Sequence, residues 1–325
     1  MRIRQILSLA LLCATSVGLY AQRDYTQYVN PNIGITHSRW FFYTPAAMPF
    51  GLAKLGPSTN GTYGNKQGWE AVGYQDDHRT IDGFPCLHEF QIGGIALMPV
   101  TGNVLTVSGK VEDAASGFRG TMDKGSEVSQ PGYYSIRLSD YNVKAELTAT
   151  KRVGLQRFTF GKSADAHILF NIGSRQGESG EVLDANIRQV SKHEIEGYVI
   201  TKPQYVKNYQ PDAVVPMYFH AWVSKVPRGV RVFHIGGSME KGNCINGVGA
   251  VMCLDYATKE GEQITVKVGL SYTSVDNARL NYEAEARSVD FDRAHADAHK
   301  TWNEYLGRID VKDSSSDNLK KFYTG

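Results

Sequence analysis

Several features are scarce in this 325-residue sequence, and each absence excludes a class of protein. The chain has 35 basic and 33 acidic residues, and this small excess equals Arg2 and Arg4 at the N-terminus. The rest of the chain is neutral and has no basic run, so it lacks the electrostatic footprint of proteins that bind nucleic acids or anionic membranes. No apolar stretch after residue 21 is long enough for a membrane helix. We therefore expect no nucleic-acid partner and no membrane span.

Cysteine is scarce as well. After residue 21 the chain has only Cys86, Cys244 and Cys253. An odd number at wide spacing excludes a disulfide framework and a zinc signature. At most one bridge can form, and Cys244 with Cys253 is the candidate pair, with Cys86 left free. The sequence also has no Gly-rich phosphate-binding loop and no serine or cysteine nucleophile motif.

The first 21 residues have the pattern of a signal peptide. Arg2 and Arg4 form a positive start, residues 6–17 are apolar, and Ala21 offers a cleavage point. Cys13 lies inside this segment but does not follow the small residue of a lipoprotein site, so a lipid anchor is the weaker alternative. We expect residues 1–21 to be a cleaved export signal. The mature protein would then be periplasmic, on the cell surface or extracellular.

Residues 104–274 have the pattern of β-strands. Apolar and polar residues alternate at 143–150 and at 264–272, which places the apolar residues on one face of each strand. Further β-rich runs, separated by Gly- and Pro-containing turns, lie at 133–138, 156–160, 167–171, 217–226, 230–235 and 248–256. No helical pattern lies between them, as a parallel α/β fold would require. The sequence therefore predicts a mainly β fold, with two stacked antiparallel sheets in a domain over residues 22–274.

The composition changes to a helical pattern after residue 274. Residues 275–286 and 290–306 have apolar side chains at helical spacing, and we expect a helical linker over 275–312. His295 and His299 lie one turn apart without the glutamate of a metalloprotease motif, so we interpret them as solvated helix surface. Residues 318–323 look like the opening turn of a further helix whose apolar face has nothing to pack on. We interpret 313–325 as the truncated start of a helical domain.

The first hundred residues carry motifs that resemble glycoside hydrolase family 92. They are rich in Gly, Pro and aromatic residues, with little periodicity. The matching segments are 28–34, 49–52, 68–69, 73–74, 81–84, His88 and 95–102. Later segments that look like the same family are 131–135, 146–152, 290–303 and 321–324. The resemblance covers nearly the whole chain after residue 21, in the same order.

The resemblance implies a galactose-mutarotase-like supersandwich joined by helices to an (α/α)6 barrel. Family members are calcium-dependent exo-α-mannosidases that invert the anomeric centre, which requires one carboxyl as acid and one carboxylate as base. In the family both carboxylates come from the barrel, and no residue here matches either. We therefore expect no catalytic residue in this chain and no hydrolysis by it alone. Calcium is implied by the resemblance alone, with its ligands in the missing barrel. The implied partners are α-mannoside glycans and that barrel.

Four candidate sugar-binding residues follow from the resemblance and from side-chain chemistry. Trp69 matches a family tryptophan, whose indole face suits the C–H face of a pyranose. His88 matches the second of two histidines in the family's Gly-Phe loop. Glu70 and Glu89 are sequence neighbours that could hydrogen-bond to sugar hydroxyls. A tryptophan in a β protein is more often core than ligand platform, and a lone histidine is more often structural.

Two further candidates and several departures lie in the same region. His37 and Arg39 could also bond to hydroxyls, although their segment departs from the family's Gly-rich turn. Cys86 replaces the family's first histidine, and a thiol–imidazole pair or metal site with His88 is only weakly indicated. Because of these departures, the sequence does not indicate which glycosidic linkage the protein prefers.

Two functions from different classes fit the sequence. The first is the N-terminal, substrate-contacting domain of an exported α-mannosidase separated from its barrel. The alternative is a stand-alone, non-catalytic carbohydrate-binding β-sandwich, which requires the linker helices to fold back and cover their own apolar stripe. A fragment without function is the remaining possibility.

Overall fold

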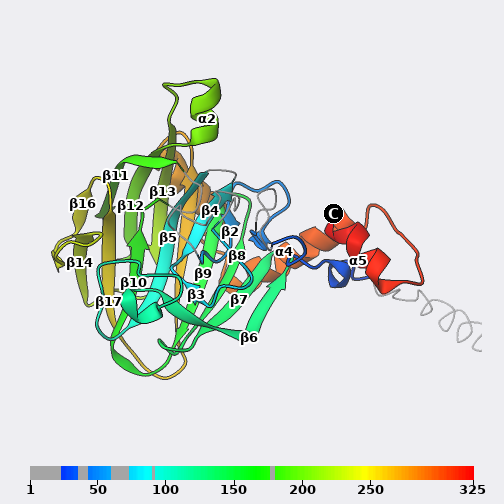
Figure 1. Cartoon of the computed structure of the whole chain (residues 1–325), viewed down its shortest axis with the longest axis horizontal. Coiled ribbons are helices and arrows are strands. Elements are labelled where there is room, and N and C mark those ends of the chain that lie inside the picture. The colour runs from blue at the N-terminus through cyan, green and yellow to red at the C-terminus, as the bar shows by residue number, and fades with distance from the viewer. Residues whose placement is uncertain (1–22, 36–42, 60–72, 90–91, 176–179) are drawn as a thin grey trace, which may run out of the picture.

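The computed structural model describes residues 23–35, 43–59, 73–89, 92–175 and 180–325. Two large, mostly antiparallel sheets stack face to face, and helices follow at the C-terminal end (Figure 1). This confirms the predicted mainly β fold. The expected signal peptide lies outside the described residues. No helix among the described residues is long and apolar enough to span a membrane.

The first sheet has eight strands and mixes distant parts of the chain. Its only parallel pair is β2 with β4; the other pairs are antiparallel. The strands, in spatial order, are β1 (Ala46–Ala47), β2 (Lys54–Leu55), β4 (Phe84–Glu89), β5 (Ile92–Thr101), β10 (Ser163–Asn171), β17 (Ala250–Thr258), β14 (Gly229–His234) and β15 (Glu240–Lys241).

The second sheet has ten strands, of which most are sequence neighbours joined by short turns. The strands, in spatial order, are β16 (Cys244–Asn246), β11 (Glu181–Gln189), β12 (Glu194–Lys202), β13 (Val215–Val223), β18 (Glu262–Ser271), β9 (Val153–Phe160), β8 (Val143–Ala149), β7 (Tyr133–Leu138), β6 (Gly120–Gln130) and β3 (Thr80–Ile81). Apolar side chains from both sheets fill the space between them, with Phe84, Phe158, Phe170 and Phe219 fully buried.

Among the described residues, the helices that precede the last strand are short. Two 3-10 turns, η1 (Thr26–Tyr28) and η2 (Ala114–Ser116), and the helix α2 (Gln204–Tyr209) lie in connections. After the last strand come α3 (Val275–Glu285), α4 (Phe291–Leu306) and α5 (Ser316–Thr324). Ser274, Asp290 and Ser315 cap these three helices, because each side chain accepts a bond from a backbone N–H three residues later. These three helices lie where the sequence predicts helical segments, whereas α2 lies between two strands, where the sequence predicts none.

The strands β8 and β18 have the predicted alternation, but several of their polar side chains are buried. In a sandwich of two layers alone, these side chains would face the solvent. Glu146 and Thr148 of β8, and Lys267 of β18, are all buried. The reason is a third layer: α3 packs on β13 and β18, and α4 packs on β8 and β9. The part of the outer face formed by β8, β9, β13 and β18 is therefore an internal surface, and its charged residues need partners there.

The helices supply those partners. Lys267 donates to the carbonyl oxygens of Ala286 and Val289, 2.8 Å away in each case, and so caps the end of α3. Burial lowers the pKa of Lys267. On β12, the buried carboxylate of Glu196 accepts bonds from His220 at 3.1 Å and from Nε of Arg279 on α3 at 3.0 Å. Charged groups hold the helices on the sheet.

The end of the chain differs from the expectation of an unpartnered helix. Leu319 and Tyr323 of α5 are buried, and Tyr323 packs against the rings of Tyr25 and Tyr28 beside η1. The N-terminal segment thus covers the apolar face of α5 (Figure 1). The expectation that this face has nothing to pack on is wrong.

The interpretation of the two histidines of α4 as solvated surface is wrong for His295, which is partly buried, whereas the His299 side chain is 44% exposed. The His295 ring stacks on Tyr133 with ring centroids 4.2 Å apart. The Nε2 atom of His299 lies 3.0 Å from Oγ1 of Thr26. Trp302, on the same helix, donates from Nε1 to the Ala47 carbonyl at 2.7 Å.

The candidate disulfide between Cys244 and Cys253 does not form. Both cysteines and Cys86 are free thiols. Cys244 is exposed on β16 at the edge of the ten-stranded sheet, whereas Cys253 is buried on β17 in the other sheet. The two side chains belong to different layers, which a sequence separation of nine residues does not reveal.

We predict that Glu196→Ala lowers the free energy of unfolding by about 3 kcal/mol, because it removes the hydrogen-bond partner of the buried His220 ring and the counter-charge of Arg279. Urea unfolding of the whole chain measures this. The control is Glu304→Ala, which removes an exposed pair with Lys300 and should change the free energy by less than about 0.5 kcal/mol. Equal effects of the two substitutions would contradict the role of Glu196.

Candidate functional site

Most of the predicted sugar-binding residues cannot be placed. His37, Arg39, Trp69 and Glu70 lie outside the described residues. Glu89 ends β4, but only its backbone is described. The structure therefore neither gathers these residues nor separates them, and their role stays a prediction.

His88 is the one predicted residue whose side chain is described. It lies on β4, paired in register with Gly93 of β5, and is 2% exposed. Neither ring nitrogen has a hydrogen-bond partner in the described part of the chain. Burial lowers the pKa of His88 to about 3, so the ring is neutral at physiological pH. A buried imidazole without partners is unusual, and a hydroxyl group that reached it would satisfy one of its nitrogens.

Cys86 does not form a reactive pair with His88. Its thiol is fully buried and accepts a bond from Nε2 of Gln156 at 3.3 Å, while the same amide donates to the Phe84 carbonyl at 2.9 Å. Burial raises the pKa of Cys86 to about 12. A thiol with this pKa is not a nucleophile at neutral pH. Cys86 is a core residue.

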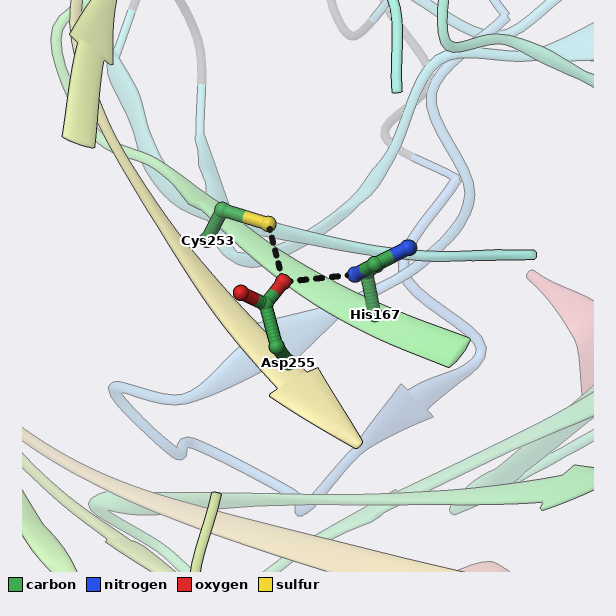
Figure 2. A group of neighbouring side chains, drawn as sticks. All are labelled: His167, Cys253 and Asp255. Carbon is green, nitrogen blue, oxygen red and sulfur yellow. Dashed lines mark hydrogen bonds and ion pairs between the residues drawn. The ribbon is translucent and has the colours of Figure 1, made fainter. Parts of the chain in front are cut away.

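A second polar cluster lies on neighbouring strands of the eight-stranded sheet. Figure 2 shows His167 from β10 with Cys253 and Asp255 from β17, their polar atoms directed toward one another. Nδ1 of His167 lies 2.7 Å from Oδ1 of Asp255, and the Cys253 thiol donates to the same oxygen at 3.4 Å. Register places them together, because His167 is opposite Asp255 in the β10–β17 ladder.

Arg231 of β14 takes the position that a metal ion would need in this cluster. Its Nη2 atom lies 2.6 Å from Oδ1 of Asp255, 3.4 Å from Nδ1 of His167 and 3.6 Å from the Cys253 sulfur. A second bond, from Nε to Oδ2 of Asp255 at 2.8 Å, fixes the guanidinium. Burial also raises the pKa of the Cys253 thiol well above its usual value. The cation of this site is therefore the arginine.

This cluster does not fit calcium. Calcium takes six to eight oxygen ligands, whereas the three side chains here supply one nitrogen, one sulfur and one carboxylate. It is the only such group of His, Cys, Asp and Glu side chains found in the described residues. We assign calcium no ligand in this part of the chain.

The ionised state of Asp255 follows from the geometry of the cluster. Burial alone would raise the pKa of Asp255, but bonds from His167 and Arg231 and the Arg231 charge hold it well below its usual range. Nδ1 of His167 lies 2.7 Å from this carboxylate, and Nε2 lies 3.0 Å from the Gly102 carbonyl oxygen. These contacts fix the position of the His167 ring.

Sequence reasoning missed this cluster and treated Cys253 only as a disulfide candidate. Its members come from three strands, and each looks like an ordinary polar interruption of an apolar run. The available signal was the presence of His167 and Asp255 inside two strands that are otherwise apolar.

The fold defines a class of protein, a two-sheet sandwich whose outer face carries the first helices of a second domain. Sequence models of known families agree with it. The glycosyl hydrolase family 92 N-terminal domain matches residues 28–271, and the family's catalytic domain matches residues 277–325. The chain belongs to glycosyl hydrolase family 92. Comparison with curated proteins gives no match.

Solved structures with the same fold include members of this family. The family GH92 alpha-mannosidase BT3965 from Bacteroides thetaiotaomicron is 27% identical, with a TM-score of 0.81 over 93% of this chain and 40% of that chain. Its complex with mannoimidazole gives a TM-score of 0.82 over 93% and 39%. The inverting mannosidase BT2199 from the same organism, 20% identical with a TM-score of 0.73 over 93% and 38%, shares the fold. This chain thus spans well under half the length of these relatives.

We predict that Asp255→Asn destabilises the protein in a pH-dependent way. The folded pKa of Asp255 lies below the unfolded value of about 3.9, so the ionised carboxylate stabilises the fold above about pH 5. This contribution is lost as the pH falls through the folded pKa. At pH 7 the variant should lose about 2 kcal/mol in free energy of unfolding.

The difference between wild type and Asp255→Asn should shrink as the pH is lowered from about 6 toward about 2. Denaturant unfolding across this range measures it. Asp165→Asn is the control, because its side chain is 63% exposed and its pair with Arg228 adds little stability. A difference that stays constant across the range would show that the Asp255 charge is not what stabilises the strands.

Proposed function

We propose that this chain is the substrate-contacting N-terminal domain of an exported family 92 α-mannosidase, together with the first helices of its catalytic domain. The observation that carries the proposal is the ordered match of both family domains over nearly the whole chain. The 27% identical relative is an alpha-mannosidase that has been captured with mannoimidazole, which supports a mannoside as the ligand class. The signal-like N-terminus supports export.

The sugar-contacting role rests on Trp69 and His88. An indole face binds a pyranose ring through its C–H groups, and a buried neutral imidazole without partners offers one donor and one acceptor. Glu70, Glu89, His37 and Arg39 supply further hydrogen bonds in this proposal. We assign no residue of the chain to proton transfer, so hydrolysis depends on carboxyl groups outside it.

A second candidate function is favoured by the packing of the helices. A stand-alone carbohydrate-binding sandwich requires the C-terminal helices to bury their own apolar faces, and Phe291, Ala298, Leu319 and Tyr323 are buried. Sequencing the gene beyond the Gly325 codon separates the two candidates. A reading frame that continues into barrel helices supports the mannosidase domain, whereas an unrelated sequence supports the stand-alone module.

Titration calorimetry of the whole chain with an α-linked mannobiose tests the sugar-binding proposal. We expect a dissociation constant on the order of 1 mM without release of mannose. Trp69→Ala should abolish the binding heat, whereas Tyr209→Ala, which removes a 77% exposed tyrosine of α2, should leave it unchanged. A folded chain without binding, or one that releases mannose, would contradict the proposal.

Calcium provides a further prediction. Because the cluster found in the described residues is unsuited to calcium, adding the ion or a chelator should change neither the mannobiose affinity nor the thermal midpoint of the chain. Thermal unfolding with and without calcium measures this. A rise in the midpoint with calcium concentration would show that the chain holds a calcium site and would contradict this prediction.

A further inference from the structure

A cavity of about 420 Å³ opens beside the cluster of Figure 2. It lies between the turn after β5, at residues 102–104, and the side chains of Asp165, His167, Arg228, Arg231 and Asp255. Its size suits one monosaccharide. Its lining is polar except for Val104 and Gly102, so charge and hydrogen bonds would decide what enters.

The charged groups around the cavity form two ion pairs. Arg228 pairs with Asp165, and Arg231 pairs with Asp255. The charges of these two pairs balance, so an anion binds here by replacing one of the two carboxylates.

The two ion pairs of the cavity differ in strength. Arg231 holds Asp255 with two bonds in a partly buried position, and His167 holds the same carboxylate. Arg228 holds Asp165 with one bond of 2.7 Å, and the two side chains are 49% and 63% exposed. An exposed single-bond pair is weak and opens easily. Arg228 is thus the guanidinium that a ligand can reach.

We propose that this cavity binds a small sugar carboxylate of the size of a hexuronate, whose carboxylate replaces Asp165 on Arg228. A guanidinium group can bind a carboxylate through two parallel hydrogen bonds. Arg228 makes only one such bond to Asp165. The sugar hydroxyls then face the backbone of residues 102–104 and the Asp255 side. None of the described residues that line this cavity is a candidate for mannoside binding, so each proposal can fail without the other.

Titration calorimetry with D-glucuronate, using D-glucose as the uncharged counterpart, tests this site in the whole chain. Glucuronate should bind with a dissociation constant on the order of 1 mM, more weakly as salt is raised, and glucose should give no heat. Equal binding of glucose would overturn the role of the charge. Equal binding of inorganic phosphate would reduce the site to one for any small anion and overturn the sugar assignment.

Three variants locate the binding. Arg228→Gln should weaken glucuronate binding at least about tenfold, while Asp165→Asn should tighten it several-fold because it removes the competing carboxylate. Arg293→Gln, which opens an equally exposed pair with Asp297 on α4, should have no effect. Circular dichroism checks that each variant is folded. Weaker binding by Asp165→Asn, or unchanged binding by Arg228→Gln, would overturn the proposal.

Discussion

The outer face of the ten-stranded sheet carries charged side chains that the following helices must both bury and pair. Lys267 reaches the carbonyl end of α3, Glu196 holds Arg279 of the same helix, and Arg157 links Glu146 to Asp292 of α4. Taking such groups out of water is costly unless every charge meets a partner. The helices therefore belong to the fold of the sandwich, and the boundary between the family's two domains is a packed interface.

The N-terminal segment completes this arrangement from the other end of the sequence. Tyr25 and Tyr28 pack on Tyr323, and Arg23 pairs with Asp310 at 2.6 Å. The first described residues and the last helix thus stabilise each other across nearly the whole chain length. Both α4 and α5 contact η1 at this junction, and both helices lie within the segment that matches the family's catalytic domain.

Much of the fold could be predicted from the sequence, because alternation at 143–150 and 264–272 is a local property of buried strands. The strands β4 and β5 were harder to recognise, since Pro85, Gly93, Gly94 and Pro99 interrupt their pattern. The strand β6 has no regular alternation of apolar and polar residues, because its side chains after Met122 are at least partly exposed.

The polar cluster around Asp255 could not be predicted, because it depends on the register of three strands that are distant in sequence. The burial of the polar face of the sheet could not be predicted either. A strand with one polar face has the same sequence pattern whether water or a helix lies above that face. The candidate sugar-binding residues came mainly from family resemblance, and physical reasoning from the sequence alone would not have selected them.

Differential scanning calorimetry of the whole chain tests most directly whether the sandwich and its helices form one unit held by buried charges. We expect a single transition whose calorimetric enthalpy equals its van't Hoff enthalpy. Two transitions, with the helices melting before the sheets, would show that the charged interface does not couple them.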